Sequence, residues 1–185
     1  MPFADATLSA SVAGVPLIGW ATHTWWLARR LAAARRDPLT HLHTRDGWTA
    51  RAHRIVTHPD AYVLLLDLDG FKHINDTRGH LAGDEVLAQT AHRLASWCGP
   101  HGVAGRLGGD EFVAAVRLSG HESAPGLDRL RDRLRAPVVW DGHVIPVGVS
   151  IGSARVADLP LRTLGNALAH ADIAMYAAKG TRGRR

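Results

Sequence analysis

The chain has 185 residues, 46% of them apolar, which is enough for one domain with a real core and a short extension. Its single cysteine, Cys98, excludes an internal disulfide and any multi-cysteine zinc site. The formal charge of +5 is carried almost wholly by arginine, without the interleaved aromatic residues or long basic run typical of nucleic-acid binding, so we expect no nucleic-acid partner.

Residues 8–28 contain no acid, lysine or arginine, and Arg29 and Arg30 follow directly. This length is just sufficient to span a bilayer, with the arginines on the cytoplasmic side. Polar residues and Pro16 dilute the apolar character, so a helix that pairs two subunits is the competing interpretation. We expect residues 1–36 to form a separate N-terminal helix, which tethers a cytoplasmic domain to the membrane, promotes dimerisation, or does both.

The expected main domain covers residues 37–185 and begins with a helix over about 45–57. Tyr62 to Leu66 then form an almost continuous apolar run, typical of a strand buried on both faces. This run ends in Asp67-Leu68-Asp69, and because alternate strand residues share a face, the two carboxylates lie on one side, about 7 Å apart. Paired acids at a strand end indicate metal or phosphate chemistry, and capping of the next helix is the alternative.

A polar segment after Gly70 leads to a helix predicted over residues 81–97. Residues 103–116 follow as two short apolar runs on either side of Gly108-Gly109, which is a strong hairpin signal. Asp110 and Glu111 lie directly on that turn, and the small glycines would let a nucleotide approach the backbone closely. An exposed turn with solvated acids is an equally good interpretation of this stretch alone.

The remaining chain alternates helices and strands. We predict a helix over 123–135, a strand over 137–140, a hairpin turn at Asp141-Gly142, a strand over 143–156 and a last helix over 161–178. A basic tail follows. These elements predict an α/β fold with a mixed sheet.

The two acidic stretches gain a meaning if they are neighbours in one antiparallel sheet. Carboxylates on adjacent strands repel one another unless cations lie between them. Two divalent ions roughly 3.5–4 Å apart would solve this problem and would suit in-line attack at phosphorus. Oxygen ligands favour Mg²⁺ or Mn²⁺, so the residues alone suggest metal-dependent nucleotidyl transfer.

From Asp37 to Lys179 the chain resembles the GGDEF-type diguanylate cyclases. Gly108-Gly109-Asp110-Glu111-Phe112 matches the signature of that family. Further motifs match in order: DPLTHLHTR at 37–45, DLDGFKHINDTRGHLAGDEVL at 67–87, RLGGDEF at 106–112, VSIGSA at 149–154 and ADIAMYAAK at 171–179. The resemblance implies a palm or ferredoxin-like fold, a central and mostly antiparallel sheet flanked by helices.

The resemblance also implies a role for each matching residue. Asp67, the carbonyl of Leu68 and Asp110 would hold two Mg²⁺ or Mn²⁺ ions per active site. Asn75 and Asp84 would bind the guanine edge, and Gly108-Gly109 would make room for the nucleotide. Lys72 and Lys179 would contact the β- and γ-phosphates, and Glu111 would orient or deprotonate the attacking hydroxyl.

The implied reaction joins two GTP molecules into cyclic di-GMP and releases two pyrophosphates. Each subunit would bind one GTP, so the active enzyme would be a homodimer. The chain departs from the family at two places. Gly99 to Gly102 replace an inhibitory Arg-x-x-Asp product site. Gly183 replaces a phosphate-binding arginine, and its neighbours Arg182 and Arg184 are the two candidates to take over that role.

Two alternatives from other classes remain at this point. A catalytically silent GTP-binding or signalling module would share the fold without turnover. The run ending in Asp67-Leu68-Asp69-Gly70 also resembles the first motif of haloacid-dehalogenase-like phosphatases, although Phe71 stands where that motif has threonine.

Overall fold

A computed structural model describes residues 20, 23–24, 35–119 and 123–180. The chain divides into two compact units, Met1–Arg35 and Arg36–Arg185. Nearly all of the apolar stretch at 8–28 lies outside the described residues, and so do Arg182 and Arg184. Within the described part of the chain, no helix is both long and apolar enough to span a membrane.

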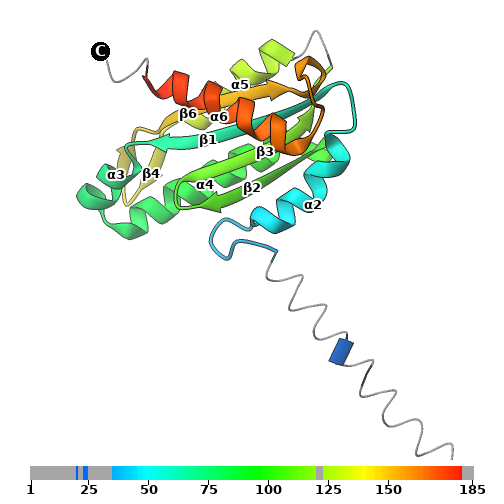
Figure 1. The fold of residues 1–185 in the computed structure, drawn as a ribbon. Helices are drawn as coiled ribbons and strands as arrows, with labels where there is room; N and C mark the ends of the chain where they lie inside the picture. The colour runs from blue at the N-terminus through cyan, green and yellow to red at the C-terminus, as the bar shows by residue number, and fades with distance from the viewer. Residues whose placement is uncertain (1–19, 21–22, 25–34, 120–122, 181–185) are drawn as a thin grey trace, which may run out of the picture. The chain divides into compact units, whose positions relative to one another are not determined.

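The second unit is built on a four-stranded sheet with the order β2-β3-β1-β6, in which all neighbours run antiparallel. Its strands are β1 (Ala61–Asp69), β2 (Gly102–Gly108), β3 (Glu111–Arg117) and β6 (Gly148–Arg155). Figure 1 shows β1 and β3 in the middle of the sheet. The predicted central strand and the predicted hairpin are therefore both confirmed.

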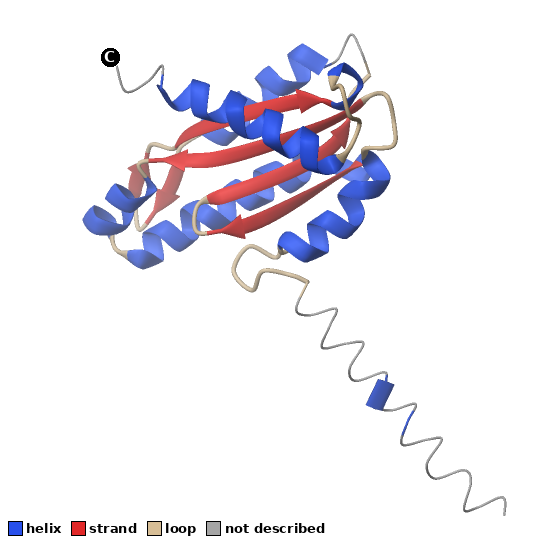
Figure 2. Cartoon of the chain, in the orientation of Figure 1, coloured by secondary structure: helices blue, strands red, loops and turns tan. Residues whose placement is uncertain are grey.

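Helices cover both faces of this sheet (Figure 2). They are α2 (Arg45–Ile55), α3 (Phe71–Arg78), α4 (His80–Cys98), α5 (Ser123–Arg135) and α6 (Leu164–Gly180). One core cluster joins the sheet to α4 and α5, and a second joins the opposite face to α2 and α6. This is the flanked, mostly antiparallel sheet that the family resemblance implies.

The alternation of β1 explains why its sequence is apolar throughout. Leu64 and Leu66 belong to the cluster under α4, whereas Val63 belongs to the cluster under α6. All three are at most 1% exposed. Burial of each such side chain contributes about 1.5–3 kcal/mol, so the strand is fixed from both sides up to the point where its acids begin.

Two element boundaries differ from the prediction. The strand expected over 143–156 is divided into β5 (His143–Ile145), which pairs only with β4 (Val138–Trp140), and β6 in the main sheet. The division falls at Pro146-Val147, and proline has no N–H to donate to a ladder. The segment after Gly70 is a helix of its own, α3, which Gly79 separates from α4 with a φ of 83°.

Candidate active site

The β2–β3 turn is shaped by its glycines. Gly108 and Gly109 have φ values of 148° and 52°, in the region that favours glycine, and the ladder shifts register between Arg106 and Gly108. A side chain at either glycine would meet nothing within 4 Å. The turn therefore presents open backbone directly before Asp110 and Glu111.

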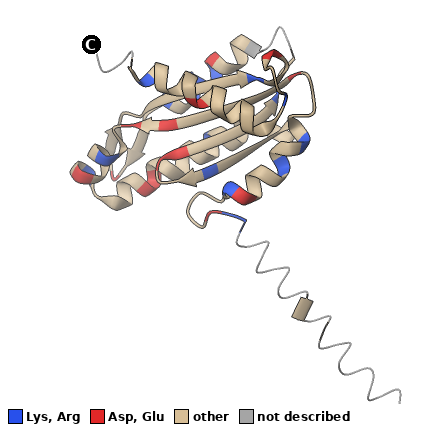
Figure 3. Ribbon diagram, viewed as in Figure 1, with Lys and Arg blue, Asp and Glu red and all other residues tan. Residues whose placement is uncertain are grey.

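The sheet places this turn beside the acidic end of β1. Asp67 lies opposite Glu111 on β3, and the N–H of Leu68 donates to the carbonyl of Asp110 at 3.3 Å. Figure 3 shows the acidic segments of β1 and of the β2–β3 turn at the same end of the sheet. The two acidic stretches are thus brought together, as the sequence argument requires.

The paired acids of β1 have different surroundings. Ser150 on β6, which is 1% exposed, donates its hydroxyl to Asp69 Oδ1 at 2.6 Å. Asp67 instead receives the ammonium group of Lys179, with Nζ 2.8 Å from Oδ1. Asp69 is consequently anchored to β6, whereas Asp67 faces the last turn of α6.

Lys179 is held by negative charge from several acids. Burial by itself lowers the pKa of this lysine, but the hydrogen bond and charge of Asp67, with the charges of Asp110 and Asp69, raise the pKa above its ordinary value. The ammonium therefore remains charged at neutral pH and compensates the acidic strand end. Its side chain is 40% exposed, against 13% for Asp67, so it can leave this position for another anion.

The donors at this strand end fit a hard divalent cation. Asp67 and Asp110 would supply carboxylates and Leu68 a main-chain carbonyl, and oxygen ligands are those that Mg²⁺ and Mn²⁺ prefer. The ammonium of Lys179 on Asp67 shows that this position accepts a positive charge. Within the described residues, no group of three or more His, Cys, Asp or Glu side chains is arranged to hold a metal. A ligand set with only two carboxylates would not form such a group.

The residues expected to bind guanine lie on two adjoining helices. Asn75 is on α3 and Asp84 is on α4. The neighbour of Asp84, Gly83, makes room for the amide of Asn75, because a Cβ at Gly83 would lie 1.9 Å from Asn75 Oδ1. Lys72 is an exposed residue of α3, and no ion pair of this lysine occurs among the described residues.

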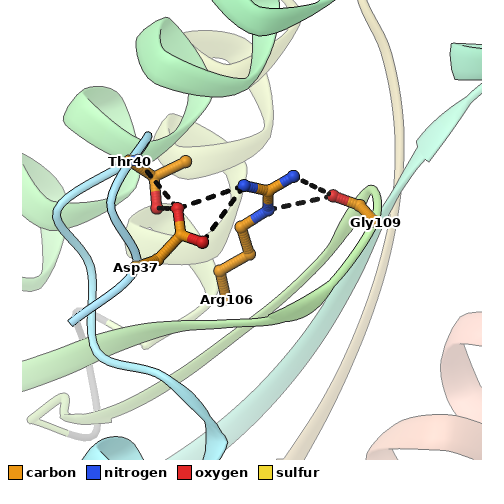
Figure 4. Close-up of polar contacts among 4 residues, drawn as sticks. All are labelled: Asp37, Thr40, Arg106 and Gly109. Atoms are coloured by element: carbon orange, nitrogen blue, oxygen red, sulfur yellow. Dashed lines mark hydrogen bonds and ion pairs between the residues drawn. The ribbon is translucent and has the colours of Figure 1, made fainter. Parts of the chain in front are cut away.

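The sequence reasoning missed one group at the turn, the guanidinium of Arg106 (Figure 4). Its Nε and Nη2 donate to the carbonyl of Gly109 at 3.0 and 2.8 Å, and its Nη1 contacts both carboxylate oxygens of Asp37 at 3.1 and 3.3 Å. Thr40 donates to Asp37 from its N–H at 2.8 Å and from its hydroxyl at 2.6 Å. The only sequence feature that pointed to this contact was the position of Arg106, two residues before the Gly-Gly pair.

The charge of Asp37 is stabilised in this arrangement. Burial raises the pKa of its carboxyl, but the hydrogen bonds from Thr40 and the hydrogen bond and charge of Arg106 outweigh that effect and hold the pKa below its usual range. Asp37 and Arg106 are 19% and 14% exposed at their side chains. Their pair is therefore shielded from water more than an ordinary surface ion pair.

Comparison with known proteins identifies the family of this fold and site. Residues 34–185 match the family described as diguanylate cyclase, GGDEF domain. An uncharacterised 19.3 kDa protein of Streptomyces ambofaciens is 61% identical over 167 residues, which cover 90% of both chains. The diguanylate cyclase TpbB of Pseudomonas aeruginosa is 36% identical over 157 residues, which cover 79% of this chain and 35% of TpbB.

A solved structure agrees with this match. A sensory box/GGDEF family protein from Caulobacter crescentus superposes with a TM-score of 0.73 at 37% identity, covering 80% of this chain and 99% of that one. The chain spans about a sixth to two fifths of the length of several curated relatives that it matches. The match decides against a haloacid-dehalogenase-like phosphatase, and the chain belongs to the GGDEF-domain family of diguanylate cyclases.

Proposed function

We propose that this chain makes cyclic di-GMP from two GTP molecules and releases two pyrophosphates, as a homodimer. The observation that carries the proposal is the meeting of Asp67, Leu68 and Asp110 at one end of the sheet, where the β1 strand end adjoins the Gly-Gly turn. The family match and the named cyclases among the relatives support the same activity.

In this proposal Asp67, the carbonyl of Leu68 and Asp110 hold two Mg²⁺ or Mn²⁺ ions. When bound, such ions polarise the phosphoryl oxygens and favour ionisation of the attacking hydroxyl. The chain contributes the oxygen donors, because the β1–β3 ladder and the Leu68–Asp110 hydrogen bond hold the end of β1, with Asp67, beside the turn that carries Asp110.

The nucleotide would be held by residues on three helical segments. Asn75 and Asp84 present hydrogen-bonding groups to the guanine edge, and a site built for these groups leaves them unpaired when adenine binds.

Lys72 and Lys179 offer point charges to the β- and γ-phosphates. Arg182 and Arg184 remain proposals from sequence for the same phosphates. Gly108 and Gly109 leave space beside the backbone.

The chemical step is a displacement at the α-phosphorus. The 3′-oxygen of one GTP forms a bond to the α-phosphorus of the other, and the bond from that phosphorus to the bridging oxygen of the β-phosphate breaks, releasing pyrophosphate. Glu111, which begins β3 and is exposed, is the proposed acceptor or orienting group for the 3′-hydroxyl proton. A second displacement of the same kind, with the roles of the two nucleotides exchanged, closes the ring and releases the second pyrophosphate. Two GTP-loaded subunits must therefore face each other.

The decisive experiment measures GTP turnover by the full-length protein with Mg²⁺ or Mn²⁺ and separates the products by chromatography. We expect cyclic di-GMP from the parent and none from Asp110→Ala. Asp132→Ala, at an exposed position of α5, is the matched control and should retain parental turnover. A folded, dimeric parent that binds GTP without turning it over would instead favour a GTP-binding signalling module, and free phosphate as the product would contradict both.

A further inference from the structure

We propose that Arg106 is a positioning residue that fixes the Gly108–Gly109 turn, and with it the carboxylate of Asp110, and that Asp37 holds Arg106 in place. We call Asp37, Arg106 and the carbonyl of Gly109 the turn clamp. The effect of the clamp on GTP turnover rests on the proposed function, whereas its effect on the conformation of the turn does not depend on that function.

The clamp uses all three guanidinium nitrogens. Nε and Nη2 together enclose one carbonyl oxygen, that of Gly109, while Nη1 reaches the carboxylate of Asp37 (Figure 4). A planar fork can serve both partners at once, whereas a lysine ammonium at this position is a single point charge on a flexible stem. The geometry is therefore specific for arginine.

The turn needs such a restraint because its glycines have no side chains to pack. Nothing lies within 4 Å of the place where a Cβ would stand at either glycine, and glycine loses more conformational freedom on ordering than any other residue. The carbonyl that Arg106 binds belongs to the peptide bond that leads into Asp110. On the other side, the carbonyl of Asp110 receives the N–H of Leu68 at 3.3 Å. These two contacts bracket the proposed metal ligand.

Asp37 is itself a fixed point. Its carboxylate accepts two hydrogen bonds from Thr40, and its N–H donates to the carbonyl of Leu42 at 2.8 Å. The N–H of Arg106 donates to the carbonyl of His43 at 2.8 Å, so the same loop also lies against the backbone of β2. The clamp thus joins the first residues of the Arg36–Arg185 unit to the proposed metal site.

The substitutions that test the clamp are Arg106→Lys, Asp37→Asn and the double variant, in the full-length chain. Asp37→Asn keeps one acceptor oxygen for Thr40, removes the charge opposite Arg106 and replaces the second acceptor of the Arg106 contact by an NH2 donor. The control is Arg155→Lys, whose arginine pairs with Asp158 at 3.5 Å on the exposed surface. Thermal unfolding of each variant establishes that it is folded before the other measurements are compared.

The first measurement is amide hydrogen exchange in peptides that cover residues 106–112. We expect Arg106→Lys to accelerate exchange in this turn about tenfold, with the Leu68 amide that it binds, and to leave β6 and the rest of β1 unchanged. The second is Mn²⁺ binding followed by electron paramagnetic resonance without nucleotide, with the dissociation constant expected to rise about tenfold. Because the two residues act as one unit, the double variant should be no worse than Arg106→Lys.

In turnover, the metal concentration for half-maximal rate should rise in the clamp variants while the KM for GTP at saturating metal stays near the parental value. Unchanged exchange and unchanged Mn²⁺ affinity in Arg106→Lys would overturn the inference. Equal acceleration across the whole sheet would also overturn it, because Arg106 would then be a general stability residue. A parent that makes no cyclic di-GMP but has an Arg106-dependent turn would sink the proposed function and leave the positioning role standing.

Discussion

Lys179 and Asp67 form an ion pair between a residue proposed for phosphate and one proposed for metal, with 2.8 Å between Nζ and Oδ1. In this arrangement the ammonium occupies a position on the carboxylate that a divalent ion would compete for. The lysine should therefore oppose metal binding before the nucleotide arrives and assist GTP binding afterwards. One substitution is expected to move the two affinities in opposite directions.

We expect Lys179→Gln to lower the dissociation constant for Mn²⁺ about two- to fivefold without nucleotide, since a partly exposed ion pair contributes about 0.5–1 kcal/mol. The KM for GTP should rise about tenfold through loss of a phosphate contact. Lys72→Gln is the matched control, because Lys72 has no ion pair among the described residues and should change only the KM. Weaker Mn²⁺ binding by Lys179→Gln would contradict the idea that the lysine competes.

Gly83 controls the orientation of the residue proposed to read guanine. A Cβ at Gly83 would lie 1.9 Å from Asn75 Oδ1 and 3.2 Å from Phe71 Cζ, so Gly83→Ala forces the Asn75 amide to move. We expect the KM for GTP to rise about tenfold with little change in kcat, as for loss of about one hydrogen bond. Alanine favours a helix over glycine by about 1 kcal/mol, so α4 should stay folded.

The double variant Gly83→Ala/Asn75→Ala separates this effect from a general disturbance. If Gly83→Ala acts through Asn75, the KM of the double variant will equal that of Asn75→Ala alone. Additive losses would mean that the added methyl group damages the site by another route.

At the residue scale, the places of Asp67, Asp69, Asp110 and Glu111 were predictable because these acids stand in local patterns, a strand end and a Gly-Gly turn. The phosphate roles of Lys72 and Lys179 come from the family resemblance and stay predictions. The role of Arg106 was not predictable, since its partner Asp37 is 69 residues away and the contact depends on the path of the loop after Asp37. The different side-chain partners of Asp67 and Asp69 could not be predicted from the sequence either. They depend on Ser150 and Lys179, which only the folded sheet brings to β1.

Among the elements, β6 and α6 make an unusually close contact. A Cβ at Gly152 would lie 2.0 Å from the carbonyl oxygen of Ala171 and 2.3 Å from the backbone nitrogen of Met175. These are main-chain atoms, so the helix itself would have to move. Because α6 carries Lys179, a displacement here reaches the proposed active site.

We expect Gly152→Ala to destabilise the protein by about 1–3 kcal/mol through overpacking and to lower Tm accordingly, with a higher KM for GTP. The control is Gly165→Ala in α6, the helix that Gly152 contacts. An added Cβ at Gly165 meets nothing within 4 Å. Gly165 is the second residue of α6, so that change should leave the stability at or slightly above the parental value. Thermal unfolding of both variants measures the difference, and a parental Tm for Gly152→Ala would refute the close contact.

Element types were readable from periodicity, and the exceptions have local causes. Proline at 146 ends the pairing of β5 with β4 before β6 begins, and a strand pattern that continues through it conceals the change of sheet. The helix α3 is short and polar with no buried residue, so it lacks the apolar stripe by which helices are recognised. Its existence matters for function because it carries Lys72 and Asn75.

At the scale of the whole molecule, the proposed mechanism makes this site half of a reaction centre. All the residues assigned to GTP and metal come from one chain, and they account for one nucleotide. Each bond that is made joins the 3′-oxygen of one nucleotide to the α-phosphorus of another, so the rate must depend on the meeting of two loaded subunits. This requirement can be measured without knowledge of the interface.

We expect the rate of cyclic di-GMP formation to rise with the square of protein concentration where monomers predominate, and linearly once dimers saturate. Excess Asp110→Ala should poison a fixed amount of parent, because mixed dimers lack one complete site. An equal excess of an unrelated protein should leave the rate unchanged. A rate that stays proportional to protein concentration throughout, with no poisoning, would fit either a permanent dimer that does not exchange subunits or an active monomer. Sedimentation of the same samples distinguishes such a dimer from a monomer, and an active monomer would rule out the two-subunit mechanism.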